Sequence, residues 1–199
     1  MKSFYISLGI FAAVGIFYIL VVLPSAGGRY VYLLDDTYIH LSVAKHFAQD
    51  GVWGITKYGF SSTSSSPLFT FLMSACIAAF GNSEFIPLYM NAVFSVALVY
   101  LLSKYYSYYF NKTSAVVAAV LFTLFFAVMH LHLLSGMEHV LQVLIVVANV
   151  IALRLCLDQT FANRDAKIAF FGSLALLGMA RFEMMFYFVS LAFVFILVK

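Results

Sequence analysis

Long apolar runs alternate with short polar connections along most of this chain. The runs cover about residues 4–23, 67–80, 85–103, 114–131, 138–157, 168–180 and 184–198. A helix rises 1.5 Å per residue, so about 20 apolar residues cross a hydrocarbon core about 30 Å thick. The run at 67–80 gives a helix of only about 21 Å, which is too short for an upright crossing. The pattern therefore predicts an all-α polytopic membrane protein with about six transmembrane helices.

The basic residues of the connections favour the same number of crossings. If 67–80 does not cross, one side of the membrane receives Lys2, Lys104, Lys112, Arg154, Arg164, Lys167 and Lys199, and the other receives Arg29, Lys45, Lys57 and Arg181. Cytoplasmic loops carry an excess of Lys and Arg, so the first group marks the cytoplasmic side. We expect one module, residues 1–199, in the plasma (inner) membrane with both termini cytoplasmic. Its non-cytoplasmic loop at 25–84 would hold juxtamembrane helices at about 36–50 and 67–80.

Composition agrees with a bilayer environment and argues against several classes of function. Hydrophobic residues make up 64% of the chain and charged residues 10%, whereas about a quarter of a soluble domain is charged. The net charge of +3 comes without a basic run that could follow a nucleic-acid backbone. Cys76 and Cys156 lie far apart in apolar runs, so we expect neither a zinc site nor a redox centre. We expect no bound cofactor, although Asp35-Asp36 beside His40 leaves a divalent metal open.

The long polar loop contains an amphipathic segment that begins at Asp35-Asp36 and stops at Gly51. At 100° per residue, Asp36 shares a face with His40, Val43 and Phe47, which would point Asp36 along an apolar stripe into the protein. Two interpretations remain open. Either Asp35 or Asp36 merely caps the helix, or Asp36 is a functional acid with His40 as a hydrogen-bonded partner. The Ser/Thr run at 61–66 reads as a flexible polar segment.

Three further charged residues, Glu138, Arg181 and Glu183, lie where predicted spans begin or end. A charge at the bilayer centre costs about 2.5–3.5 kcal/mol, so we expect these residues near the outer boundary, with Arg181 and Glu183 close to that boundary or paired with each other. Glu138 can serve simply as an acid at the start of a span, or it can belong to a site. Charged residues at one face, rather than at mid-membrane positions, disfavour a transporter.

Four polar motifs follow one another along the chain. They are Asp35-Asp36-Thr37-Tyr38-Ile39, Ser66-Pro67-Leu68-Phe69-Thr70, Ser135-Gly136-Met137-Glu138 and Ala180-Arg181-Phe182-Glu183. In this order and spacing they resemble the N-terminal membrane module of GT-C superfamily glycosyltransferases, in particular the branch of arabinofuranosyltransferases and mannosyltransferases. The resemblance covers essentially the whole chain.

The resemblance implies transfer of a sugar from a polyprenyl-phosphate donor to a glycan, lipid or protein acceptor on the non-cytoplasmic face. It makes Asp36 the general base, with Asp35 beside it. His40, Lys57, Glu138, Arg181 and Glu183 would lie around the substrates, and Arg181 would be the first candidate to hold the leaving phosphate. GT-C enzymes are commonly longer than this chain. We therefore also expect a partial enzyme, a second membrane chain that completes it, or an inactive accessory subunit.

Overall fold

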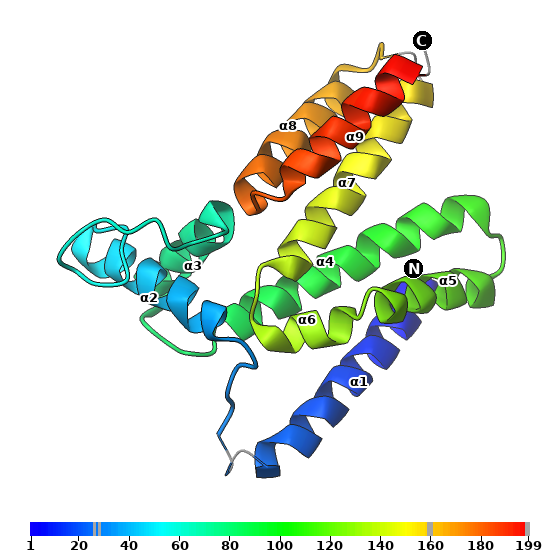
Figure 1. Ribbon diagram of the computed structural model, residues 1–199. Coiled ribbons are helices and arrows are strands. Elements are labelled where there is room, and N and C mark those ends of the chain that lie inside the picture. Colours follow the sequence, from blue (N-terminus) through cyan, green and yellow to red (C-terminus); the bar gives the residue numbers. More distant parts are fainter. Residues whose placement is uncertain (26, 28, 159–160, 198–199) are drawn as a thin grey trace.

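The computed structural model describes residues 1–25, 27, 29–158 and 161–197, so Lys199 and the end of the apolar run at 184–198 lie outside the described residues. The described chain is all-helical, without strands (Figure 1). Its helices are α1 (Lys2–Ser25), α2 (Asp35–Asp50), α3 (Pro67–Phe80), α4 (Ile86–Tyr109), α5 (Thr113–Phe126), α6 (Met129–Ser135), α7 (His139–Asp158), α8 (Arg164–Ala180) and α9 (Met184–Leu197).

Three of these helices are long and apolar enough to cross a membrane, namely α1, α4 and α7. A fourth crossing results if α5 and α6 count as one span bent by 53°. The sequence predicts one unbroken run here, but the helix ends at Phe126 and resumes at Met129. Val128 lies between them with φ of 52°, a left-handed conformation that is unfavourable for a β-branched residue. The apolar helices α3 and α9 are shorter, with 14 residues each and a length of about 21 Å.

Three apolar clusters connect the helices. One joins α2 and α3 to α4, α7 and α8 through residues such as Phe69, Met73, Leu141 and Leu177. Another lies among α1, α4, α5 and α6. The third lies between α7 and α8, and side chains of α9 pack against it. Outside these clusters many large apolar side chains are exposed, and α9 has no buried residue. A soluble protein avoids such extended apolar surface, so these faces fit a lipid environment.

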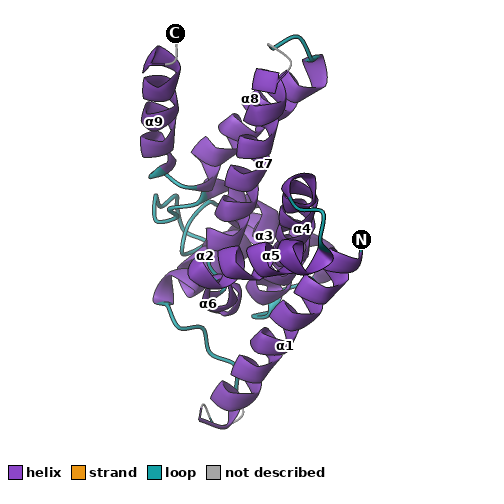
Figure 2. Cartoon of the chain, turned by 90° about the vertical axis from the view of Figure 1, so that its right-hand side faces the viewer, coloured by secondary structure: helices purple, strands orange, loops and turns teal. Residues whose placement is uncertain are grey.

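Helices α2 and α3 lie together at one end of α4, α7 and α8 (Figures 1 and 2). Helix α3 has the predicted bounds, with Pro67 in its first turn, where a missing backbone N–H costs nothing. Helix α2 begins one residue earlier than expected and ends at Gly51, whose φ of 69° continues into a left-handed turn. Both helices border the charged residues described below.

The expected inward orientation of Asp36 is wrong. Asp35 and Asp36 are both exposed, and the buried residues of α2 are Thr37, His40, Val43 and Ala44. Helical phase does place Asp36 on the side of His40, but the contacts that bury His40, with Ser64, Thr70 and Glu138, lie one turn further along α2. The capping interpretation is also wrong, because the N-cap position is Leu34 and no side chain caps the helix.

The start of α4 lies near the start of α7, and the end of α4 lies near the end of α7. Near the start of each helix, Ile86 and Met90 pack with Leu141. Near the other end, Lys104 of α4 and Arg154 of α7 line the same pocket. The two helices therefore run in the same direction, and α5 with α6 returns the chain between them.

Candidate functional site

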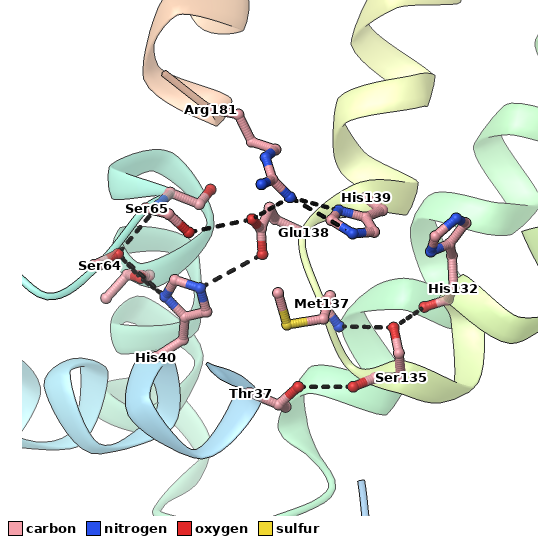
Figure 3. Close-up of polar contacts among 12 residues, drawn as sticks. Thr37, His40, Ser64, Ser65, His132, Ser135, Met137, Glu138, His139 and Arg181 are labelled. Carbon is pink, nitrogen blue, oxygen red and sulfur yellow. Dashed lines mark hydrogen bonds and ion pairs between the residues drawn. The ribbon is translucent and has the colours of Figure 1, made fainter. Parts of the chain in front are cut away.

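Four segments that are distant in sequence meet at the α2–α3 end of the molecule (Figure 3). They are the first half of α2, the Ser/Thr run at 61–66 with the start of α3, the turn between α6 and α7, and the connection from α8 to α9. Each contributes polar side chains to a set of contacts centred on Glu138. We call the residues His40, Glu138, Arg181 and Glu183 the charged cluster.

Glu138 lies in the turn before α7 and is fully buried. Its Oε1 is 3.1 Å from Nη1 of Arg181 and accepts a longer contact, 3.4 Å, from Oγ of Ser65. Its Oε2 faces Nε2 of His40 at 3.5 Å. A buried carboxylate without partners would be very costly, so these contacts account for its presence there.

Arg181 follows the last residue of α8 and connects two carboxylates. Its Nε and Nη2 donate to the two oxygens of Glu183 at 3.0 and 2.7 Å, a bidentate pair. The pairing of Arg181 with Glu183 that the sequence suggests is therefore confirmed. Nη1 points instead to Glu138 and also lies 2.9 Å from Nδ1 of His139.

His40 connects α2 to the Ser/Thr run. Its ring is buried, and Nδ1 lies 3.1 Å from both Oγ of Ser64 and Oγ1 of Thr70. Those two hydroxyls also contact each other at 2.8 Å. With Nδ1 accepting from a hydroxyl, the proton of a neutral ring is on Nε2, directed at Glu138.

The charges of the cluster act on one another. Burial alone raises the pKa of Glu138, but the contact with His40, a backbone hydrogen bond and the charge of Arg181 outweigh it, so the pKa lies below its ordinary value. The hydrogen bond from Arg181 lowers the pKa of Glu183 to about 2. The pKa of Arg181 is raised, first by the hydrogen bond to Glu183 and further by the charges of Glu138, Glu183 and Asp36. The carboxylates are therefore ionised at neutral pH.

The turn that carries Glu138 is fixed from two sides. Oγ1 of Thr37 donates to the carbonyl of Ser135 at 2.7 Å, and Nδ2 of Asn91 donates to the carbonyl of Met137 at 2.9 Å. Gly136 has φ of 70°, and a Cβ there would lie 2.4 Å from the ring of Tyr32. Glycine is required at this point because of both the conformation and the space.

Four of the residues selected from the sequence come together in the charged cluster. Asp36 is exposed one turn before His40, and its charge reaches Arg181. Asp35 is exposed beside it. Lys57 does not join the described ion pairs, and its ammonium group lies 5.5 Å from the ring centre of Tyr58.

Several side chains that contribute to the site are not among the site residues that the sequence indicates. Ser64, Ser65, Thr70, Asn91 and His139 all contact the cluster or its turn. The Ser/Thr run is more than an exposed polar connection, because Ser64 and Ser66 are buried. One signal was present for Asn91, an amide within an otherwise apolar run.

Among the described residues no group of three or more His, Cys, Asp and Glu side chains is arranged to hold a metal ion. Cys76 and Cys156 are free thiols. The arrangement thus offers an exposed carboxylate, Asp36, beside a buried and charge-compensated network.

The fold and the site define an all-helical chain with three or four helices suited to crossing a membrane and a buried charged cluster at one end of them. The chain matches no protein-family model, and comparison with curated proteins and with solved structures gives no match.

Proposed function

We propose that this chain is a glycosyltransferase module of the GT-C type, which transfers a sugar from a polyprenyl-phosphate donor to a glycan, lipid or protein acceptor. The observation that carries the proposal is a set of contacts around one buried carboxylate, Glu138, which belongs to the third motif. Its partners are Arg181 of the fourth motif, His40, which directly follows the first motif, and Ser65, which directly precedes the second. The first motif ends at Ile39 and the fourth begins at Ala180, yet polar side chains from or beside all four motifs meet at one end of the apolar helices. Packing of apolar helices alone does not require such a meeting.

Asp36 is the proposed general base. It is exposed at the first turn of α2, next to the buried cluster, so an acceptor can reach it from outside. The acceptor oxygen attacks the anomeric carbon while Asp36 takes the hydroxyl proton. The bond from that carbon to the phosphate oxygen breaks, and the lipid phosphate leaves with the electron pair.

The charged cluster is the proposed framework that positions this acid. Glu138 connects His40, one turn after Asp36, to Arg181. Thr37, adjacent to Asp36, is fixed to the α6–α7 turn. The first turn of α2 is therefore fixed at two successive points, which limits the positions that the Asp36 carboxylate can adopt.

Direct binding of the leaving phosphate by Arg181 is the part of the sequence hypothesis that the geometry favours least. All its donor groups that face the site already meet Glu138, Glu183 or His139. A phosphate would have to displace the exposed carboxylate, Glu183. The loop at 25–84 contains three further basic residues, Arg29, Lys45 and Lys57, and we propose that they supply part of the positive charge that faces the leaving phosphate.

The membrane arrangement proposed here is six crossings in the plasma (inner) membrane, both termini cytoplasmic, and the charged cluster outside. The parallel course of α4 and α7 supports it, because Lys104 and Arg154 then lie at the end opposite to Glu138. The shorter α8 and α9 would complete the number of crossings. The lipid bilayer, the lipid-linked donor and the acceptor are the proposed partners.

A second candidate function is that of an accessory or inactive subunit that partners another membrane chain. Two observations favour it. The charge of Arg181 is compensated within the chain, and one face of α9 leaves large apolar side chains such as Phe186, Val189 and Phe193 exposed. This alternative requires no role for Asp36 in chemistry.

Sugar transfer from a polyprenyl-phosphate donor, measured in membranes that contain wild-type or Asp36→Asn protein, tests the proposal. Loss of a general base lowers the rate by about 10²–10⁴-fold, and we expect a loss of that size. Asp50→Asn is the matched control, since Asp50 is an exposed acid at the far end of the same helix. Full activity of Asp36→Asn would exclude the proposed mechanism, and no transfer by wild-type protein unless a second chain is added would favour the accessory function.

A further inference from the structure

A second charged location lies between the C-terminal ends of α4 and α7, on the side of the molecule away from α2 and α3 (Figure 1). These ends border a pocket of about 230 Å³. Lys104, Tyr105 and Tyr108 line it from α4, and Arg154, Leu155 and Asp158 line it from α7. We call this the α4–α7 groove.

Arg154 is held in a defined orientation. Its guanidinium lies 4.0 Å from the ring centre of Tyr108 and 4.8 Å from that of Tyr109, as in cation–π contacts. Its Nε is 3.4 Å from Oδ2 of Asp158, one helical turn on. Asp158 is more than half exposed, and pairs of this kind are weak. The nitrogens of Arg154 at the other end of the guanidinium are not in that ion pair.

Lys104 supplies the second positive charge. It is exposed on α4 and lines the same groove as Arg154. The groove thus has two cations against one carboxylate, with aliphatic side chains and tyrosine rings beside them. Tyrosine, lysine and arginine at the ends of membrane helices are typical of the boundary between the hydrocarbon core and the lipid headgroups.

We propose that the α4–α7 groove binds an anionic glycerophospholipid. Lys104 and Arg154 contact the headgroup phosphate, and one acyl chain lies along the aliphatic part of the groove. The argument rests on charge complementarity and on α4 and α7 being two of the helices suited to crossing a membrane. Basic pockets between membrane helices on the cytoplasmic side bind the phosphates of anionic lipids. The inference does not depend on the sugar-transfer proposal.

Asp158 opposes this binding. Its carboxylate is the ion-pair partner of Arg154 and repels a phosphate from the same place. A bound lipid therefore has to displace that contact. Removing the carboxylate charge should strengthen binding of an anionic lipid, whereas a purely structural role of the Arg154–Asp158 pair predicts no such gain.

Native mass spectrometry of the detergent-purified full chain, titrated with phosphatidylglycerol or phosphatidylcholine of equal acyl composition, tests the inference. We expect preferential retention of phosphatidylglycerol. Lys104→Gln and Arg154→Gln should each weaken it about fivefold, and Asp158→Asn should strengthen it. Lys112→Gln is the matched control, because Lys112 is exposed in the same part of the chain but does not line the groove.

Equal retention of the two lipids overturns the proposal, as does an equal loss in Lys112→Gln. Competition by inorganic phosphate that abolishes the preference would also overturn it, because the site would then take a free anion rather than a lipid. Should Arg154→Gln fail to fold, the exposed positions Lys104 and Asp158 still decide the question through opposite changes in retention.

Discussion

Replacing Glu138 by glutamine removes a fully buried charge while keeping the shape of the side chain. In the wild-type chain this carboxylate meets Arg181 at 3.1 Å and His40 at 3.5 Å. Removing one partner of a buried ion pair typically costs about 3–5 kcal/mol, because the other charge is left uncompensated. Arg181 keeps Glu183 as a partner and is about one-fifth exposed, at 19%, so we expect the lower end, about 3 kcal/mol.

This loss corresponds to a change of about 150-fold in the folding equilibrium. For a chain of this length it lowers the midpoint of thermal unfolding by about 6–12 °C. Thermal unfolding of the detergent-purified protein, followed by loss of the monodisperse species, measures this shift. Glu183→Gln is the matched control, since Glu183 pairs with the same arginine but has a side chain that is 53% exposed. There we expect about 1 kcal/mol or less.

A Glu138→Gln protein as stable as wild type would refute the reasoning. So would a shift no larger than that of Glu183→Gln, because it would mean that burial of the carboxylate does not increase the strength of its contacts. An unfolding midpoint that falls for Glu138→Gln alone identifies Glu138 as the structural centre of the charged cluster.

Three further predictions follow from particular contacts. The pKa of Glu183 is about 2 in the folded chain and 4.5 in the reference state, so the stabilisation from this group is complete above pH 4.5 and is lost as the pH falls toward 2. The midpoint of unfolding should fall over this range in wild type and fall less in Glu183→Gln, in which Glu138, whose pKa is also lowered, still contributes; an equal fall in both proteins would contradict the contribution of Glu183. Gly136→Ala introduces a clash and a strained φ, and should destabilise by at least 1–3 kcal/mol, whereas Gly172→Ala, with open space around it, should not destabilise. Asn149 of α7 donates a hydrogen bond to the carbonyl of Phe170 in α8 and accepts one from the hydroxyl of Tyr187 in α9. Asn149→Leu should therefore lower the free energy of unfolding by about 1–2 kcal/mol and increase hydrogen exchange in α9. Unchanged exchange would contradict the role of this contact.

The helices of the loop were largely predictable from the sequence. Pro67 and Gly51 gave clear boundary signals, and the structure places helix ends next to both. These signals work because they depend on local backbone chemistry, a missing N–H in one case and a left-handed φ in the other. Helices that depend on such local features can be read without tertiary information.

The orientation of Asp36 could not be predicted in the same way. Helical phase gives the direction in which a side chain points but says nothing about which neighbour covers it. His40 and Asp36 share a face, yet only His40 is buried, because the Ser/Thr run and the α6–α7 turn pack over its part of α2. Coverage is a tertiary property, and no local pattern encodes it.

The charged cluster was predictable in its members but not in its centre. Isolated charges at the ends of apolar runs indicated Glu138, Arg181 and Glu183 as residues of interest. That Glu138 is fully buried and connects two other segments depends on where the Ser/Thr run packs. The break at Val128 was equally hidden, since the apolar run continues through it without a glycine or proline.

Sugar transfer measured per folded molecule, for Asp36→Asn and Glu138→Gln side by side, tests the central claim most directly. The claim is that exposed Asp36 performs the proton transfer while buried Glu138 holds the structure. It predicts that Asp36→Asn keeps the wild-type unfolding midpoint and loses about 10²–10⁴-fold in rate. For Glu138→Gln it predicts that the main effect is a lower unfolding midpoint. Wild-type transfer by Asp36→Asn, with inactivity of a fully stable Glu138→Gln protein, would contradict it.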